Sequence, residues 1–213
     1  MSTATTTRPT APSPSAHRIT VDEYERIIEA GALEDPGRVE LIDGELVDKM
    51  GKTAAHGWVA KEVLKALESR LPAGWTSRKD EPVRLPDYDE PEPDVAIVRG
   101  VDADYEFRLP AAADVALVVE VSASTLGQDR GQKLSASARG GIPVYWIVNL
   151  IDRQLEVYSR PGKNGYRSHK TFGTGEQVHV VIGGQKLPAI AVDSLLPRRE
   201  APDGKGRPKG AGA

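Results

Sequence analysis

The chain has 213 residues, of which 39% are hydrophobic and 28% charged, and its formal net charge is −3. This balance is typical of a soluble globular protein, and the length allows one domain with a sizeable core. The absence of cysteine excludes disulfides, thiolate-bound zinc, iron–sulfur clusters and cysteine nucleophiles. No apolar run reaches the ~18 residues of a membrane span, and the N-terminal residues lack the apolar core of a secretory signal. We therefore expect a cytoplasmic protein.

The charge is unevenly distributed along the chain. Residues 1–18 contain two arginines and no acid, and residues 197–213 contain five basic and two acidic residues. The segment between them, residues 19–196, therefore carries a formal charge of −8. Both terminal segments lack apolar residues to bury, which predicts disordered tails around a single folded domain at 19–196. The basic tails could add salt-sensitive affinity for nucleic acid.

The predicted elements begin with Thr20 and Glu23, which have the spacing of a capping box and start a short helix to about Ala30. Asp43-Gly44 between apolar alternations predicts a β-hairpin. Apolar spacing, β-branched runs and turn residues then predict helices at 55–71 and 128–139 and strands at 75–79, 82–85, 93–98, 115–121, 144–148, 155–158, 166–172 and 178–182. This order predicts an α/β or α+β fold with a mixed central β-sheet, flanking helices and antiparallel hairpins toward the C-terminus.

Acidic residues on apolar strands are the strongest chemical signal. Glu120 follows an apolar run, Asp94 begins a second apolar strand, and Glu40 alternates with apolar residues on a third. A buried carboxylate costs several kcal/mol unless it is paired or bound to a metal. Three such oxygen donors suit magnesium or manganese. The alternative, that each carboxylate faces water at a strand end, is about equally common.

Lys133 and His56 are weaker candidates when judged on spacing alone. Lys133 follows Asp129 by four residues, which favours a solvated ion pair on a helix over a cation that stabilises phosphate charge. His56 stands at the start of a helix, where a hydrogen-bonded structural role is more common than a proton shuttle. Tyr145 and Trp146 lie between apolar residues, which favours a core position or a subunit contact.

An ordered set of short motifs resembles a known family. The set comprises Leu41-Ile42-Asp43-Gly44-Glu45, Met50, His56, Glu90-Pro91-Glu92-Pro93-Asp94, Val118-Val119-Glu120-Val121-Ser122, Ser124-Thr125-Leu126, Asp129-Arg130, Lys133, Gly141-Ile142-Pro143 and Tyr145-Trp146-Ile147-Val148. Together these motifs resemble the Uma-two family of restriction-endonuclease-like proteins, which belongs to the PD-(D/E)xK nuclease superfamily. The resemblance covers about residues 20–196.

The resemblance implies a restriction-endonuclease-like core and a divalent metal, Mg²⁺ or alternatively Mn²⁺, held by strand carboxylates. Asp94 would be the acid of the "PD" element and Glu120 the acid of the (D/E)xK element, with Glu40 as an additional metal ligand. Ser122 stands where the superfamily lysine would be, and the resemblance assigns that role to Lys133.

The resemblance also implies that His56 approaches the site from its helix. The chain departs from the family pattern at Ala123, Ser137, Val144 and Asn149.

These observations favour a metal-dependent endonuclease that hydrolyses phosphodiester bonds of DNA. Two alternatives stay open: a catalytically silent binding or scaffold protein with the nuclease fold, and a metal-dependent hydrolase of another phosphate ester. Many such nucleases pair their sites, so we also expect a homodimer, with Tyr145 and Trp146 bordering its interface. No membrane partner is expected.

Overall fold

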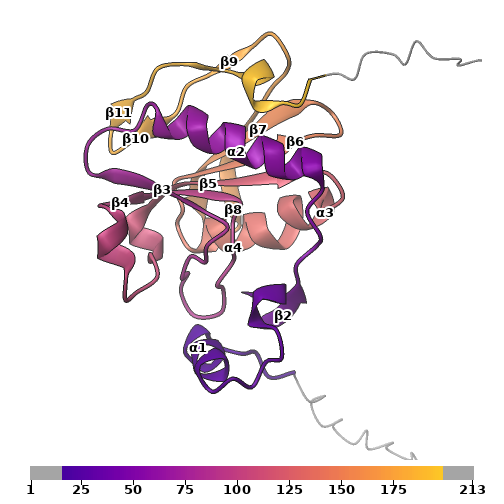
Figure 1. Cartoon of the computed structure of the whole chain (residues 1–213), viewed down its shortest axis with the longest axis vertical. Coiled ribbons are helices and arrows are strands. Elements are labelled where there is room, and N and C mark those ends of the chain that lie inside the picture. The colour runs from indigo at the N-terminus through magenta and orange to yellow at the C-terminus, as the bar shows by residue number, and fades with distance from the viewer. Residues whose placement is uncertain (1–15, 199–213) are drawn as a thin grey trace, which may run out of the picture.

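The computed structural model describes residues 16–198 (Figure 1). In chain order its helices and strands are α1 (Val21–Glu29), β1 (Val39–Ile42), β2 (Glu45–Asp48), α2 (Ala54–Glu68), β3 (Trp75–Lys79), β4 (Val95–Arg99), β5 (Val115–Ser122), α3 (Leu126–Gln128), a π-helical segment (Asp129–Lys133), α4 (Leu134–Arg139), β6 (Val144–Asn149), β7 (Gln154–Gly162), β8 (Gly165–Phe172), β9 (Gln177–Val178), β10 (Val181–Ile182), β11 (Gln185–Lys186) and β12 (Ile190–Ala191). Four 3₁₀ turns separate some of these elements. No described helix is both long and apolar enough to cross a membrane.

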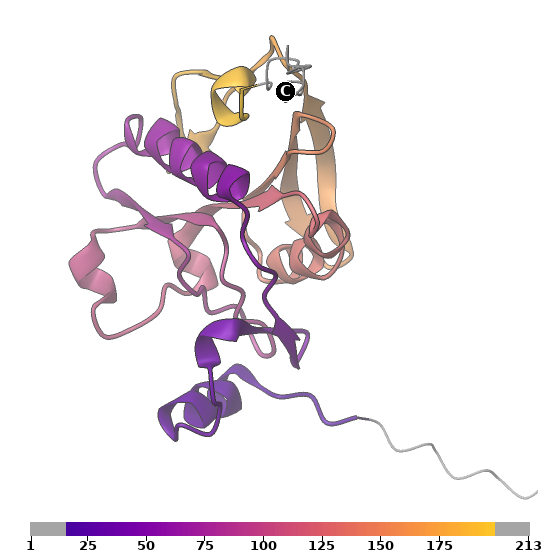
Figure 2. The same ribbon diagram turned by 45° about the vertical axis from the view of Figure 1, so that its right-hand side comes forward.

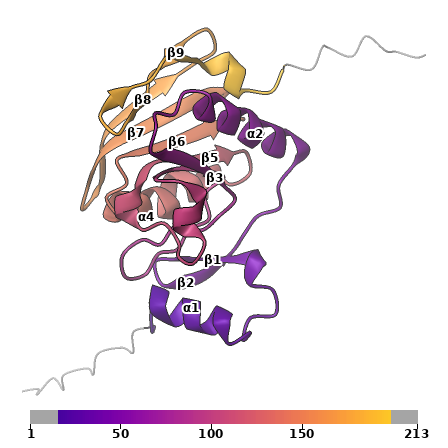
Figure 3. The ribbon, with the colours of Figure 1, turned by 60° about the vertical axis from the view of Figure 1, so that its left-hand side comes forward.

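The centre of the molecule is a six-stranded sheet in the order β3-β4-β5-β6-β7-β8. Only β5 and β6 run parallel, and every other neighbouring pair is antiparallel. A parallel pair needs a crossover, which α3, the π-helical segment and α4 provide. Helix α2 covers one face of the sheet and the crossover helices cover the other (Figures 2 and 3). The predicted mixed sheet with flanking helices and C-terminal hairpins is therefore confirmed.

Strand β5 is buried along its whole length, and its side chains alternate between the two faces. Val119 and Val121 pack with α2, whereas Val118 packs with the crossover side. By this alternation Glu120 projects toward the crossover helices. The same alternation on β6 sends Tyr145 and Trp146 to opposite cores, and both are completely buried. The expectation that these two residues border a dimer interface is therefore wrong.

The hairpin β1–β2 forms a separate two-stranded sheet beside α1 (Figure 3). Its turn has positive φ at Asp43 and Gly44, as the predicted Asp-Gly turn requires, and a Cβ on Gly44 would come within 2.6 Å of Arg18. The amide of Asp43 donates to Asp89, and Arg139 of α4 donates to both carboxylates. These bonds attach the hairpin to the main body.

Most predicted elements are confirmed, including the capping box at the start of α1. Three predictions were wrong in detail. Residues 82–85 form only isolated bridges rather than a strand, residues 178–182 divide into β9 and β10, and the helix over 128–139 contains the π-helical segment. The predicted disordered tails fall largely on residues 1–15 and 199–213, which lie outside the described residues.

Candidate active site

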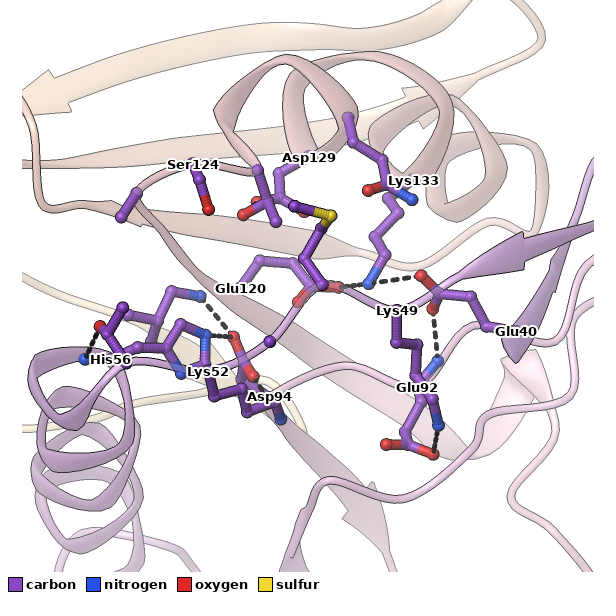
Figure 4. Close-up of a pocket in the computed structure, with 17 residues that line it drawn as sticks. Glu40, Lys49, Lys52, His56, Glu92, Asp94, Glu120, Ser124, Asp129 and Lys133 are labelled. Atoms are coloured by element: carbon purple, nitrogen blue, oxygen red, sulfur yellow. Dashed lines mark hydrogen bonds and ion pairs between the residues drawn. The ribbon is translucent and has the colours of Figure 1, made fainter. Parts of the chain in front are cut away.

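A small polar cavity of about 60 Å³ lies where the β1–β2 hairpin, the start of α2, the end of β5 and the crossover helices meet (Figure 4). Its volume leaves room for a few water molecules. The lining contains the five predicted site residues, Glu40, His56, Asp94, Glu120 and Lys133. The structure therefore brings together side chains from the hairpin, α2, the residue before β4, β5 and the π-helical segment.

Lys133 connects two of the predicted metal ligands. Its Nζ atom lies 3.0 Å from Glu40 Oε1 and 3.3 Å from Glu120 Oε1. All three side chains are at least 90% buried. The second oxygen of Glu40 accepts a hydrogen bond from the amide of Glu92. The solvated pair between Lys133 and Asp129 that spacing favoured is not formed, because Lys133 points inward.

Asp94 is held by three donors. His56 Nε2 lies 3.0 Å from Asp94 Oδ2, and Lys52 Nζ lies 2.9 Å from Asp94 Oδ1. The amide of Val121 donates to Asp94 Oδ2 at 2.7 Å. Lys52 also pairs with Asp80. The antiparallel register of β4 and β5 pairs Val95 with Val119. Asp94 immediately precedes Val95, so it lies opposite Glu120.

Two residues of the crossover extend the site. The Asp129 carboxylate is buried and accepts hydrogen bonds from the hydroxyls of Ser122 at 2.8 Å and Thr125 at 2.7 Å. The Nε2 atom of Gln128 is buried in the lining and has no hydrogen-bond partner among the described residues. The same holds for Nδ1 of His56. Gln128 thus brings to the cavity wall a buried amide nitrogen that has no hydrogen-bond partner in residues 16–198.

Asp94 and Glu120 differ in their electrostatics. Burial raises the pKa of Glu120 well above its usual range, and Lys133 only partly offsets this. Burial also acts to raise the pKa of Asp94, but the hydrogen bond and charge of His56, together with Lys52, lower it below the ordinary value. Lys133 is itself disfavoured by burial, yet Glu120 and Glu40 raise its pKa so that it stays charged.

The predicted metal ligands line one cavity, but their carboxylates are not arranged as a metal-binding site. Within residues 16–198, no three His, Asp or Glu side chains are grouped so that they could hold a metal ion together. Lys133 and Lys52 balance the negative charge that a divalent cation would otherwise balance. The donors of Asp94, Glu120 and Glu40 are all hard oxygens, which fits magnesium or manganese in chemistry.

Sequence reasoning missed four residues of the lining. Lys52 lies in an irregular segment before α2, and Gln128 and Asp129 lie on the crossover. Glu92 forms a 2.7 Å ion pair with Lys49 beside Glu40. The sequence contains a pattern that could have identified Asp129. Ser122 and Thr125 precede it by seven and four residues, and their hydroxyls donate to its carboxylate. No comparable pattern identified Lys52.

Comparison with family models matches residues 21–189 to Uma2, described as putative restriction endonuclease, which confirms the resemblance. Among solved structures, the chain is similar to a putative nuclease belonging to DUF820 from Anabaena variabilis ATCC 29413. That match has a TM-score of 0.59 and 15% sequence identity, and covers 83% of this chain and 97% of the other. At this identity the likeness shows the fold alone. No curated protein matches the sequence.

Proposed function

The chain belongs to the Uma2 family, and we propose that it is a metal-dependent endonuclease that hydrolyses phosphodiester bonds of DNA. One observation carries this proposal: Glu40, Asp94, Glu120 and Lys133 converge on a single cavity from four separate parts of the chain. Burying three carboxylates together is costly, so a fold without a use for them would gain from apolar replacements.

In this proposal Asp94, Glu120 and Glu40 would hold Mg²⁺ or Mn²⁺ after they close on the cation and give up the contacts with Lys52 and Lys133 that now balance their charge. When bound, the cation would lower the pKa of a water molecule and neutralise charge on the phosphate. His56 fixes the orientation of Asp94 and keeps its carboxylate ionised through the 3.0 Å contact. Ionised carboxylates are the form that binds metal.

Lys133 and Gln128 would act on the phosphate. In hydrolysis the water oxygen bonds to phosphorus, the bond to the leaving oxygen breaks, and that oxygen takes up a proton. Negative charge accumulates on the phosphate oxygens during this step, and fixed donors stabilise it. Lys133 brings a buried ammonium, and Gln128 brings an amide whose Nε2 atom has no other partner in residues 16–198.

A second candidate function is a catalytically silent binding or scaffold protein. The observation that favours it is the pairing of Lys133 with Glu40 and Glu120, which satisfies both carboxylates without any metal. Lys52 does the same for Asp94. Because each buried carboxylate already has a lysine partner, its negative charge is neutralised without a bound metal ion.

Cleavage of plasmid and oligonucleotide DNA at low salt tests the proposal. Wild-type protein is assayed with Mg²⁺ or Mn²⁺ beside an EDTA control, a Glu120→Ala variant and a variant at an exposed acid, Glu106→Ala. We expect metal-dependent cleavage that EDTA and Glu120→Ala abolish and Glu106→Ala retains. No cleavage by folded wild-type protein with either metal would support the silent protein, and calorimetry with Mn²⁺ would then show whether the site binds metal at all.

A further inference from the structure

The two carboxylate oxygens of Asp94 have different partners. Oδ2 lies 3.0 Å from His56 Nε2 and accepts a 2.7 Å hydrogen bond from the amide of Val121. These two partners belong to helix α2 and to the buried strand β5, which hold them in place. Oδ1 instead lies 2.9 Å from Nζ of Lys52 (Figure 4). Oδ1 is therefore the oxygen that Asp94 can offer to a metal ion, and the ammonium of Lys52 lies beside it.

Lys52 is held less firmly than Lys133. It belongs to residues 49–53, which join β2 to α2 without regular secondary structure. Its side chain is 41% exposed, against 10% for Lys133 on the helical crossover. Lys52 also pairs with Asp80, which directly follows β3. The ammonium of Lys52 can therefore leave Asp94 and still keep a carboxylate partner and contact with water.

A divalent cation and an ammonium compete for this oxygen. Mg²⁺ binds carboxylate oxygens at about 2.1 Å, and Mn²⁺ prefers the same kind of ligand. A double positive charge at that distance from Asp94 Oδ1 would repel the Lys52 ammonium, which contacts the same atom. Because the Asp94 side chain is buried, solvent and salt screen this repulsion poorly. Metal binding at Oδ1 therefore requires Lys52 to move away.

We propose that Lys52 is an internal competitor of the divalent cation, and that its ammonium occupies the metal-binding oxygen of Asp94 until a metal ion displaces it. This inference rests on the proposed function for the choice of a metal ion as the ligand. It accounts for a cavity whose carboxylates, within residues 16–198, are not arranged to hold a metal ion, because a lysine neutralises Asp94 in the metal-free chain. Displacing Lys52 opposes metal binding, so Lys52 lowers the affinity of the site for the ion.

The neighbouring Lys49 provides a matched comparison. It lies on the same segment and lines the same cavity, and its ammonium is 2.7 Å from a carboxylate oxygen of Glu92. Glu92 is not one of the proposed metal ligands. Lys49→Gln therefore removes a charge near the cavity without freeing a metal-binding oxygen, whereas Lys52→Gln does both. Lys52→Arg keeps the charge and a group that pairs well with a carboxylate.

Calorimetric titration of the full chain with Mn²⁺ alone, without DNA, tests the proposal. We expect Lys52→Gln to bind Mn²⁺ about tenfold more tightly than wild type, because a hydrogen bond to a charged group contributes about this factor. Lys49→Gln and Lys52→Arg should bind close to wild type. Thermal unfolding in EDTA checks that all variants fold. At equal Mn²⁺ concentration, the metal should raise the Tm of Lys52→Gln more than that of wild type.

The alternative outcomes separate this inference from the proposed nuclease. An equal gain in affinity in Lys52→Gln and Lys49→Gln would overturn the competition, because the effect would then come from net charge. Mn²⁺ binding by wild type without any gain in Lys52→Gln would also overturn it, while the nuclease stands. Tighter binding by Lys52→Gln, with no DNA cleavage by wild type, would support the competition and contradict the nuclease. Absence of Mn²⁺ binding in all four proteins would contradict both.

Discussion

The ammonium nitrogen of Lys133 lies 3.0 Å from a carboxylate oxygen of Glu40, which joins the crossover helix to the separate β1–β2 hairpin. The same nitrogen reaches Glu120 on the central sheet. One buried cation thus holds three independent parts of the fold together at the candidate active site. It also determines the charge of the cavity, because two of its carboxylates share this ammonium.

Replacing Lys133 should therefore affect both stability and activity. Lys133→Met leaves Glu40 and Glu120 buried without their cation, and breaking such a pair costs about 3–5 kcal/mol. We expect this loss in the free energy of unfolding, measured with urea in EDTA, together with loss of DNA cleavage. Lys61→Met, at an exposed lysine of α2, is the control. An unfolding free energy equal to wild type would contradict the pairing.

Gln128 offers a test of phosphate contact that leaves the fold intact. Its Nε2 atom is a buried donor with no partner in the described chain, whereas Gln132 is exposed on the same crossover. Removing one donor to transition-state charge typically lowers the rate about 100-fold. We expect Gln128→Ala to lower kcat for DNA cleavage by about this factor without lowering thermal stability. Gln132→Ala should match wild type, and equal kcat values for both variants would exclude the role of Gln128.

Glu90 should make the protein less stable as the pH rises. Burial, aided by the nearby charge of Glu25, raises its pKa from 4.5 to about 7. Because the folded state binds this proton more tightly, its stabilising effect is full below pH 4.5 and is lost as the pH rises through 7. The loss is on the order of 3 kcal/mol. Urea unfolding between these pH values should show this decline in wild type and not in Glu90→Gln. A decline that persists in Glu90→Gln would assign it to another group.

Glu156 should have the opposite effect at acid pH. Burial acts to raise its pKa, but hydrogen bonds from Arg130, Asn149 and Tyr158 lower it to about 2. The ionised form is therefore favoured by folding, so its contribution is full above pH 4.5 and is lost as the pH falls toward 2. It amounts to about 2–3 kcal/mol. Arg130→Gln should reduce the acid-dependent loss in urea unfolding, and an unchanged acid limb would contradict the assignment.

Most elements of the fold could be predicted from the sequence because the patterns that indicate them lie within short segments. The Asp43-Gly44 turn needs only two residues with positive φ, and the buried strand β5 is visible as an apolar run. Glu120 and Asp94 were detectable for the same reason, since an acid within such a run needs an explanation. Residues 82–85 have a strand-like composition but pair only at isolated bridges, which composition cannot reveal.

The rest of the site depends on contacts between distant segments. Lys133 looked like the partner of Asp129 on helical spacing, yet the structure turns it toward Glu40 and Glu120. Lys52 has no periodic context, and only the fold places it 2.9 Å from Asp94. The position of Trp146 in the core could not be predicted either, because apolar neighbours in the sequence are equally compatible with an interface and with the interior.

The crossover has a further consequence for how this protein can be recognised. Superfamily nucleases place their lysine two residues after the strand acid, but here that position is Ser122, which donates to Asp129 instead. Lys133, on the crossover, has its Nζ atom 3.3 Å from Glu120 Oε1, so an ammonium group lies beside the strand acid although residue 122 is not lysine. A search for an acid-x-lysine string passes over this chain, whereas a search for an ammonium nitrogen close to a strand carboxylate finds it. In the proposed nuclease, the ammonium group is therefore defined by its position beside Glu120 and not by a fixed spacing in the sequence.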